Sequence, residues 1–146
     1  MKIIGIDPGT HTGICVYDAR DGVENPFTFQ TLGPRAHHEA LWDVLGDDPH
    51  ELHVVCERFT YQRRDKVILD SVEYIGVVKL WCAMYGTKYN TQTPSAAMNL
   101  WTDGKIKRLG LWRPNKAHEM DALRHVLYYL TNTLKDYAFI RQARQE

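Results

Sequence analysis

The order of its short apolar runs and longer amphipathic segments constrains the fold of this chain more than any other feature. Three short apolar runs come first, at residues 2–7, 13–18 and 26–32, and turn residues separate them. This pattern predicts a meander of three strands. Segments with helical spacing then alternate with further short apolar runs. We therefore expect an α/β fold in which a mixed five-stranded sheet is flanked by helices.

The later part of the chain supplies the helices and the remaining strands. The predicted elements are helices at residues 36–45, 66–85 and 117–134, a helix that begins near 93–95, and strands at 52–57 and 88–93. Residues 102–117 are rich in Lys, Arg and Gly and match neither periodicity. The tail from about residue 136 is expected to be loose. A length of 146 residues predicts a single domain, residues 1–146.

Cysteine usage and hydropathy limit the cellular setting. Cys15, Cys56 and Cys82 are scattered and never spaced as C-x-x-C, which argues against a disulfide framework or a cysteine zinc site. No run of about 18 or more apolar residues occurs, so we expect no membrane span. The amino-terminal segment lacks a basic stretch followed by a cleavable apolar stretch, so no secretory signal is expected. We therefore expect a cytoplasmic protein.

The net charge is zero, but the charges are distributed unevenly along the chain. Residues 1–51 carry 3 Lys and Arg against 9 Asp and Glu, whereas residues 52–118 carry 11 against 5. Residues 119–146 are balanced, with 4 of each sign. The basic middle segment is consistent with a face that binds a polyanion such as nucleic acid. The alternative is a patchwork of solvated charges.

Acidic residues end two of the predicted apolar strands. Asp7 ends the first strand and Glu57 ends the fourth. His118 and Asp121 are spaced i, i+3 near the start of the last long helix, so they share a helix face. Carboxylate oxygens suit Mg²⁺ or Mn²⁺ better than zinc, and two such ions are a standard device for displacement at phosphate. If these four side chains converge, they would form a site for two divalent cations.

Each of these residues also has a structural explanation. Asp7 can be a turn or cap residue at the end of its strand. Glu57 can pair with one of the arginines that follow it. His118 and Glu119 can form a solvated first turn, where acids suit the helix dipole. Singly these explanations are favoured, but the four residues form a patterned set.

Two basic segments are candidates for contact with nucleic acid. The first surrounds aromatic residues, so cations could hold phosphates while a ring stacks on an unpaired base. The second leads toward the helix of His118. The candidate residues are Arg58, Phe59, Tyr61, Arg63, Arg64 and Lys66 in the first segment, and Lys105, Lys107 and Arg108 in the second. An ordinary surface loop with Phe59 packed inward explains the first segment equally well.

Three pieces of the sequence together resemble a known family. IGIDPGTHTG, VVCERF and AHEMDAL occur in the order and rough spacing typical of the RuvC-type Holliday junction resolvases of the ribonuclease H-like superfamily. The family pattern is a GIDPG strand, a strand that ends in Glu before a long helix, and a late helix that opens with D/H-x-x-D-A. The resemblance covers most of the chain, from Ile3 to about Leu130. It implies a ribonuclease H-like mixed sheet flanked by helices.

The resemblance also implies an activity, that of a metal-dependent crossover junction endodeoxyribonuclease. Such an enzyme resolves Holliday junctions by phosphodiester hydrolysis with two Mg²⁺ or Mn²⁺ ions. Asp7 would be the bridging carboxylate and Glu57 the second ligand, and His118 and Asp121 would complete the site. His118 stands where many members have Asp, and its softer imidazole favours Mn²⁺.

Branched DNA and a second copy of the chain are the partners that the resemblance implies. In a homodimer, two sites would cut opposing strands of a four-way junction. The helix at residues 66–85 is the candidate dimer surface, although burial against its own sheet explains its apolar face equally well. PSAAMNLW lacks a lysine common in the family, and the stretch between Trp101 and Lys116 is short, which predicts a trimmed helix. These departures favour a compact phage member that also accepts flaps and three-way junctions in the host cytoplasm.

Two other classes of function share parts of this pattern. The actin and sugar-kinase families have a first phosphate loop that reads roughly GIDxGT, which makes an ATP-binding module an alternative. Against it, 146 residues is short for a two-lobed clamp, and no second Gly-rich phosphate loop follows. A non-catalytic relative that binds RNA or ribosomes is the other alternative. It would be expected to lose part of the acidic set, whereas all four positions are filled here.

Overall fold

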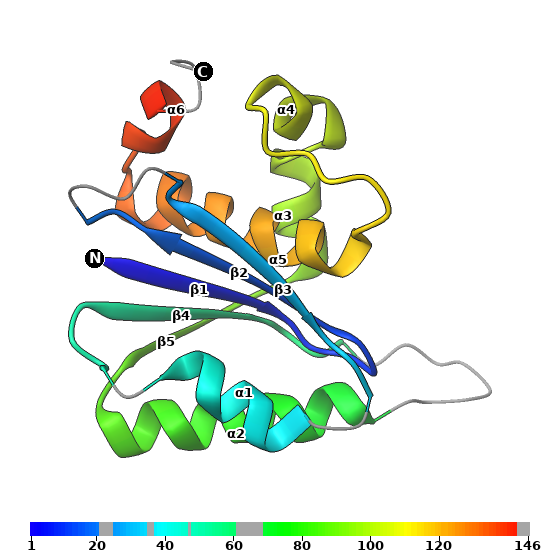
Figure 1. Ribbon diagram of the computed structural model, residues 1–146, viewed down its shortest axis with the longest axis vertical. Coiled ribbons are helices and arrows are strands. Elements are labelled where there is room, and N and C mark those ends of the chain that lie inside the picture. Colours follow the sequence, from blue (N-terminus) through cyan, green and yellow to red (C-terminus); the bar gives the residue numbers. More distant parts are fainter. Residues whose placement is uncertain (21–24, 35–36, 47, 61–68, 143–146) are drawn as a thin grey trace.

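A sheet lies between two layers of helices in the computed structural model, which describes residues 1–20, 25–34, 37–46, 48–60 and 69–142 (Figure 1). The strands are β1 (Lys2–Asp7), β2 (Thr12–Asp18), β3 (Phe27–Leu32), β4 (Leu52–Glu57) and β5 (Lys88–Gln92). The helices are α1 (His37–Leu45), α2 (Asp70–Tyr85), α3 (Pro94–Leu100), α4 (Asp103–Arg108), α5 (Ala117–Tyr128) and α6 (Ala138–Gln142). A π-helical segment, η1 (Tyr129–Leu134), continues α5.

The five strands form one mixed sheet in the order β3-β2-β1-β4-β5. The predicted meander is present, since β1 pairs antiparallel with β2 and β2 pairs antiparallel with β3. β4 is parallel to both β1 and β5. The register aligns Ile6 with Cys56, so Asp7 and Glu57 follow at the same edge of the sheet. The expected α/β class with a mixed five-stranded sheet is confirmed.

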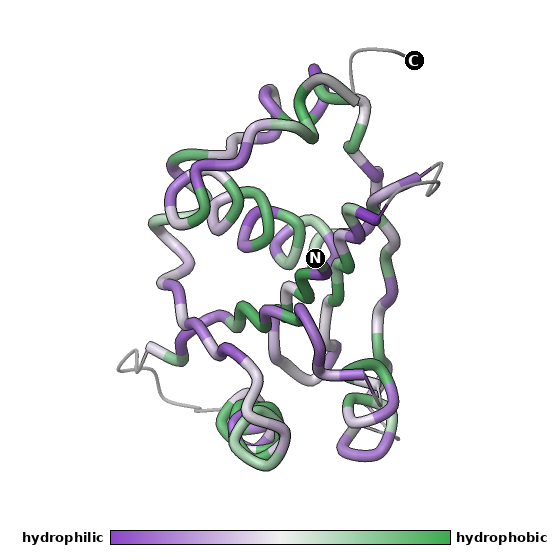
Figure 2. Tube along the Cα trace, turned by 90° about the vertical axis from the view of Figure 1, so that its left-hand side faces the viewer, coloured by the Kyte–Doolittle hydropathy of each residue, from purple (hydrophilic) through white to green (hydrophobic). Residues whose placement is uncertain are grey.

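Successive residues of β1 face opposite sides of the sheet. Ile3 belongs to the apolar cluster beneath α5, whereas Ile4 and Ile6 belong to the cluster beneath α1 and α2. Figure 2 shows apolar strand segments in the middle of the molecule, between the helix layers. Ile3, Gly5 and Asp7 alternate with Ile4 and Ile6 along the strand. Asp7 therefore lies on the face that α5 covers.

Helix α5 approaches the sheet closely because two glycines face it. A Cβ at Gly13 would lie 2.0 Å from the backbone oxygen of His118, and one at Gly5 would lie 2.5 Å from the backbone oxygen of Ala122. Any side chain at either position would push the helix away from β1 and β2. Gly5 and Gly13, the first and last residues of the GIDPGTHTG segment, thus set the distance between α5 and the sheet.

Two segments differ from the predicted secondary structure. The unassigned stretch contains the short helix α4, and the predicted helix at 117–134 is α-helical only as far as Tyr128. In the π-helical continuation the hydroxyl of Thr131 donates to the backbone oxygen of Leu127 at 2.8 Å, a local contact that competes with regular backbone pairing.

The carboxyl-terminal segment also differs from the expected loose tail. Residues 138–142 form α6, and Phe139 is fully buried. Its ring packs edge-on against Phe27 and Trp101, which holds this segment to the core. For α2, the predicted residues 66–68 lie outside the described part of the chain. Among the described residues, no helix is both long and apolar enough to cross a bilayer.

Candidate functional site

The candidate site lies at the carboxyl ends of β1 and β4, beneath the first two turns of α5. Asp7 is only 8% exposed there, although it is a carboxylate. The loop that follows it is tied to the start of α2, because Ser71 donates to the backbone oxygen of Pro8 at 2.7 Å and Thr10 donates to Asp70 at 2.9 Å. This anchoring holds the loop against the start of α2.

His118 contacts Asp7 directly from the first turn of α5. Its Nδ1 lies 3.0 Å from Oδ2 of Asp7, and its side chain is half exposed. The ring of His11, in the loop after β1, is stacked on His118 with a centroid distance of 6.2 Å. Two imidazoles thus lie at the solvent side of the buried carboxylate, and sequence analysis identified only one of them.

Asp121 lies one turn further along α5 and is held by an arginine. The guanidinium of Arg124 forms ion pairs with Asp121 and with Asp103 at the start of α4, and its Nε donates to the backbone oxygen of Trp101 at 3.1 Å. Arg124 is nearly buried. It therefore fixes Asp121 and links the short α4 region to the site.

Glu57 is held by a buried histidine that sequence analysis did not single out. Nε2 of His125 lies 3.0 Å from Oε2 of Glu57, and Nδ1 lies 2.9 Å from Oε1 of Gln92 at the end of β5. His125 is spaced i, i+4 from Asp121, so helical spacing was the available signal.

Electrostatics distinguish Asp7 from its neighbours. The pKa of its carboxyl is raised from the ordinary 3.8 to about 6. Burial is the largest cause, the nearby charges of Glu57 and Asp121 add to the rise, and the contact with His118 opposes it. Burial likewise raises the pKa of Asp121, and Arg124 opposes that shift. Asp7 therefore carries a charge that the surrounding protein compensates poorly.

The donor set fits a divalent cation. In the part of the chain that the structure describes, no group of three or more His, Cys, Asp or Glu side chains is arranged so that it could hold a metal ion. The charges of Glu57 and Asp121 nevertheless raise the pKa of Asp7, and the charge of Glu57 also raises the pKa of Asp121. A cation would relieve that repulsion. Their hard oxygen atoms suit Mg²⁺ or Mn²⁺.

Glu119 occupies the same first turn of α5 but is surrounded by partners. Its side chain is 4% exposed, Thr31 donates to Oε1 at 3.0 Å, and Arg113 Nη1 lies 3.0 Å from Oε2. Lys116 lies 3.8 Å from Oε1. The guanidinium of Arg113 also lies 5.0 Å from the ring centroid of Phe29. Glu119 is thus a buried ion-pair partner that joins β3 to the loop before α5, rather than a solvated first-turn residue.

The candidate nucleic-acid residues are only partly described. Tyr61, Arg63, Arg64 and Lys66 lie outside the described residues. Arg58 is exposed directly after Glu57, whereas Phe59 is half-buried and packs against the apolar cluster beneath α1 and α2.

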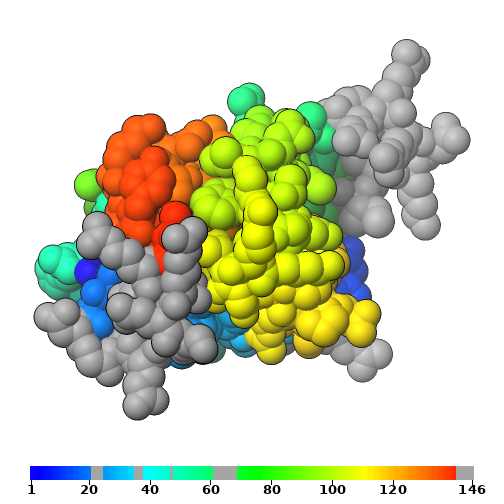
Figure 3. All heavy atoms as spheres, turned by 90° about the horizontal axis from the view of Figure 1, so that it is seen from above, coloured from blue at the N-terminus to red at the C-terminus, as the bar shows by residue number. Residues whose placement is uncertain are grey.

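The second basic segment belongs to a continuous surface formed by α3, α4 and the loop that follows (Figure 3). The ammonium group of Lys105 donates to the backbone oxygen of Leu100, and that of Lys107 lies 4.8 Å from the ring centroid of Trp112. Arg108 is exposed. The roles predicted for these residues in DNA binding stay predictions.

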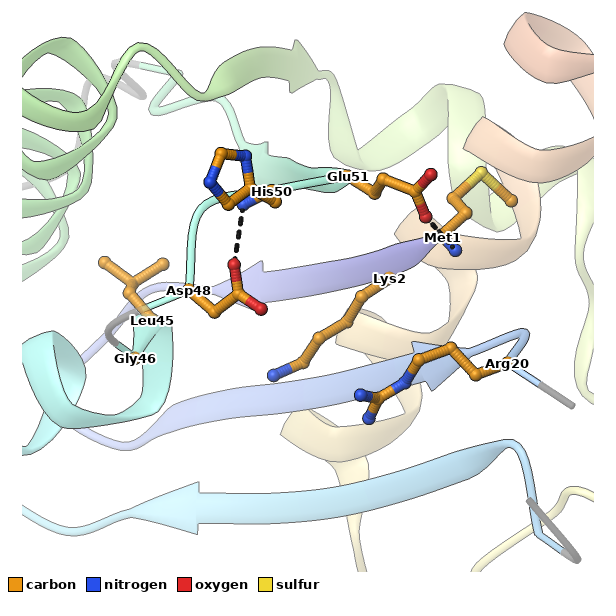
Figure 4. Close-up of a pocket in the computed structure, with 8 residues that line it drawn as sticks. All are labelled: Met1, Lys2, Arg20, Leu45, Gly46, Asp48, His50 and Glu51. Atoms are coloured by element: carbon orange, nitrogen blue, oxygen red, sulfur yellow. Dashed lines mark hydrogen bonds and ion pairs between the residues drawn. The ribbon is translucent and has the colours of Figure 1, made fainter. Parts of the chain in front are cut away.

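A hollow of about 330 Å³ lies at the opposite end of the sheet from Asp7. Residues from the start of β1 and the loops around it line this hollow (Figure 4). Charged groups in it pair locally, since the amino terminus of Met1 contacts Glu51 at 3.0 Å and Asp48 accepts the backbone N–H of His50. It shares no residue with the acidic cluster.

The fold is of the ribonuclease H-like class, and solved structures of junction resolvases share it. RuvC of Thermus thermophilus in complex with a Holliday junction substrate matches with a TM-score of 0.65 at 20% identity, over 91% of this chain and 98% of that one. The fowlpox virus Holliday junction resolvase matches with a TM-score of 0.55 at 16% identity, over 89% and 97%. No protein-family model matches the chain, and no curated protein matches its sequence.

Proposed function

We propose that this chain is a metal-dependent endonuclease that cuts branched DNA, Holliday junctions among it, by hydrolysis of a phosphodiester. The observation that carries the proposal is the buried Asp7, which lies beside two other acids at the open edge of a ribonuclease H-like sheet. A charge placed there costs free energy unless a cation accompanies it. Solved structures with the same fold are Holliday junction resolvases, one of them bound to its junction.

Four side chains would hold the metal: Asp7, Glu57, His118 and Asp121. Two Mg²⁺ or Mn²⁺ ions would supply an activated water and stabilisation for the leaving oxygen. Asp7 is the most buried of the three carboxylates, and the charges of both others act on it, which suits a shared ligand. His118, as an imidazole, would favour Mn²⁺ over Mg²⁺.

The protein's own contacts keep the acidic cluster ordered before substrate binds. Arg124 holds Asp121 from one side, and the Gly13 contact keeps the first turn of α5 close to β2. Exposed cations such as Arg58, beside Glu57, would hold a phosphate of the DNA backbone near the acids.

We propose that residues 1–146 act as one nuclease domain in the cytoplasm of a bacterial host and that the protein is of phage origin.

We further propose that the active form is a homodimer that pairs through α2. One face of α2 packs on the sheet through Ile75, Val78 and Trp81. The other face is also apolar, since Leu80 is 56% exposed and Met84 is 63% exposed. Burial against the sheet therefore explains only part of the apolar character of this helix. A second copy would cover the remainder.

The dimer can be tested by sedimentation. We expect the unchanged protein to sediment as a dimer and Leu80→Lys to weaken association by more than about tenfold, because the new charge would have to be buried. Met98→Lys, at an exposed apolar position on α3 across the sheet, is the matched control and should remain dimeric. A monomeric unchanged protein, or equal behaviour of the two variants, would contradict the proposed interface.

Cleavage of labelled DNA tests the activity. The protein would be incubated with four-way, three-way, flap and linear DNAs in Mg²⁺ or Mn²⁺, with a chelator as control. We expect metal-dependent cuts in branched DNA and a loss of more than roughly 100-fold in Asp7→Asn, beyond the usual effect of residues that only support a metal ligand. Binding of branched DNA by Asp7→Asn should persist, because its cationic surface is unchanged.

Other outcomes would point to different functions. Full nuclease activity in purified Asp7→Asn would contradict the assignment of Asp7 as a metal ligand of the active site. ATP hydrolysis without metal-dependent nicking would favour the kinase-like alternative. Paired nicks in four-way junctions alone would favour a strict resolvase, whereas cuts in many branched forms would favour a broader debranching role.

A further inference from the structure

A closed network of buried polar groups stands behind Glu57. His125 is 1% exposed, and both of its ring nitrogens lie within hydrogen-bond distance of a side chain: Glu57 at 3.0 Å and Gln92 at 2.9 Å. The amide of Gln92 in turn donates to the backbone oxygen of His125 at 3.2 Å. These three residues come from β4, β5 and α5, so the network joins three elements at one point.

The network fixes the orientation of the imidazole. Because the amide nitrogen of Gln92 donates to the backbone of His125, its oxygen faces Nδ1, which must be the donor of that hydrogen bond. The ring cannot rotate without breaking this contact. Nε2 is therefore held toward Glu57, and it donates to that carboxylate when the ring also carries a proton on Nε2.

Glu57 needs such a constraint more than the other acids of the cluster do. Its side chain is the longest of the three, and it is 24% exposed at the end of its strand. A flexible carboxylate loses rotational freedom when it binds an ion, and a partner that orders it beforehand reduces this loss. Groups that hydrogen-bond to metal ligands often serve this purpose.

We infer that His125, clamped by Gln92, is a positioning residue that orients the Glu57 carboxylate for metal binding. The inference rests on the proposed function and deepens it. The two ring nitrogens have separate tasks: Nδ1 joins α5 to β5, and Nε2 orders Glu57. A merely structural histidine would need only the first contact.

Two substitutions separate these tasks because amide side chains of different length reach different ring positions. Asn at position 125 places its amide near Nδ1, which preserves the contact with Gln92 and removes the contact with Glu57. Gln at position 125 extends its amide toward Nε2 and can contact Glu57. We expect His125→Asn to weaken Mn²⁺ binding to the DNA-free protein by about 10- to 100-fold, and His125→Gln to restore most of it.

The measurements are Mn²⁺ binding, by electron paramagnetic resonance or calorimetry, and steady-state cleavage of a four-way junction. His125→Asn should lower kcat and leave KM for DNA unchanged. His53→Asn is the matched control, because His53 lies on the same strand as Glu57 and contacts Tyr129 at 3.0 Å, away from the acids. Its Mn²⁺ affinity and kcat should equal those of the unchanged protein. Urea unfolding checks that each variant is folded.

The possible failures are distinguishable. If the unchanged protein binds Mn²⁺ and cuts the junction but folded His125→Asn does so equally well, the inference about His125 is wrong and the proposed function stands. Equal losses of Mn²⁺ affinity in His125→Asn and His125→Gln would also overturn the inference, because the contact with Glu57 would then not determine metal binding. If the unchanged protein neither binds Mn²⁺ nor cuts, the proposed function fails and this inference fails with it.

Discussion

Asp7 and Glu119 are two buried carboxylates that lie next to the same turn of α5 in opposite electrostatic surroundings. The Asp7 side chain is 12% exposed and that of Glu119 is 4% exposed, so both have lost most of their water. Glu119 has Arg113, Lys116 and the Thr31 hydroxyl around it. Asp7 has one half-exposed histidine and two further acids.

The difference separates a structural acid from a candidate functional acid. A buried charge with its own cations contributes to the fold and has little capacity for another ion. A buried charge among like charges destabilises the protein until a ligand of opposite sign binds. Both side chains are buried beside the first turn of α5, so exposure cannot explain why only one of them is left without a cation.

The largest effect on stability is expected from Gly13→Ala, which would displace the first turn of α5, beside which both acids lie. A methyl group there would lie 2.0 Å from the backbone oxygen of His118, and backbone cannot yield as a flexible side chain can. We expect a loss of about 3 kcal/mol or more in the free energy of unfolding, at the upper end for overpacking. Cleavage of branched DNA should fall with it.

Gly104→Ala is the control for this substitution. Gly104 lies in α4, and a Cβ there would meet open space. Urea unfolding should show unchanged stability or a gain of up to about 1 kcal/mol, as for glycine in a helix. If Gly13→Ala unfolds at the same urea concentration as the unchanged protein, the close approach of α5 is not a constraint.

The next effect concerns the pH dependence of stability. The folded-state pKa of Asp7 is about 6 against an ordinary 3.8, so between these values the folded protein binds more protons than the unfolded chain. Stability should therefore fall as the pH rises through this window, by roughly 3 kcal/mol for a shift of about two pKa units. Asp7→Asn lacks this titration.

Urea unfolding in a chelator, at several pH values between about 4 and 7, measures this contribution as the difference in free energy of unfolding between the unchanged protein and Asp7→Asn. The advantage of Asp7→Asn should be near zero at the acidic end and should grow toward neutral pH. A constant difference across the range would mean that Asp7 is not the residue whose pKa is raised.

Much of this arrangement could be predicted from the sequence. Strand alternation and the pairing of two runs that each end in an acid place Asp7 and Glu57 on one edge of the sheet. Helical spacing places His118 and Asp121 on one face of α5. These are local regularities with periods of about 2 and 3.6 residues, which a single sequence displays directly.

The partners of these acids could not be predicted in the same way. His125 was not singled out from the sequence, because its contacts come from two strands distant in the chain, at Glu57 and Gln92. Glu119 looked like a solvated first-turn acid because its partner Thr31 lies 88 residues away. Such contacts depend on tertiary packing, which no local period reveals.

We propose that Asp7 is an uncompensated buried charge that a divalent cation neutralises. This proposal is tested most directly by urea unfolding at neutral pH of the unchanged protein, Asp7→Asn and the matched control Glu119→Gln, each in a chelator and in excess Mg²⁺. In the chelator we expect Asp7→Asn to be more stable than the unchanged protein by about 2–3 kcal/mol. Glu119→Gln should be less stable by about 1 kcal/mol, because Arg113 loses its charged partner.

Mg²⁺ should then stabilise the unchanged protein and Glu119→Gln alike and leave Asp7→Asn nearly unaffected, because binding to the folded state raises its stability by mass action. The proposed role of Asp7 would be contradicted if Asp7→Asn were the less stable protein in the chelator and Mg²⁺ changed the stability of all three proteins equally.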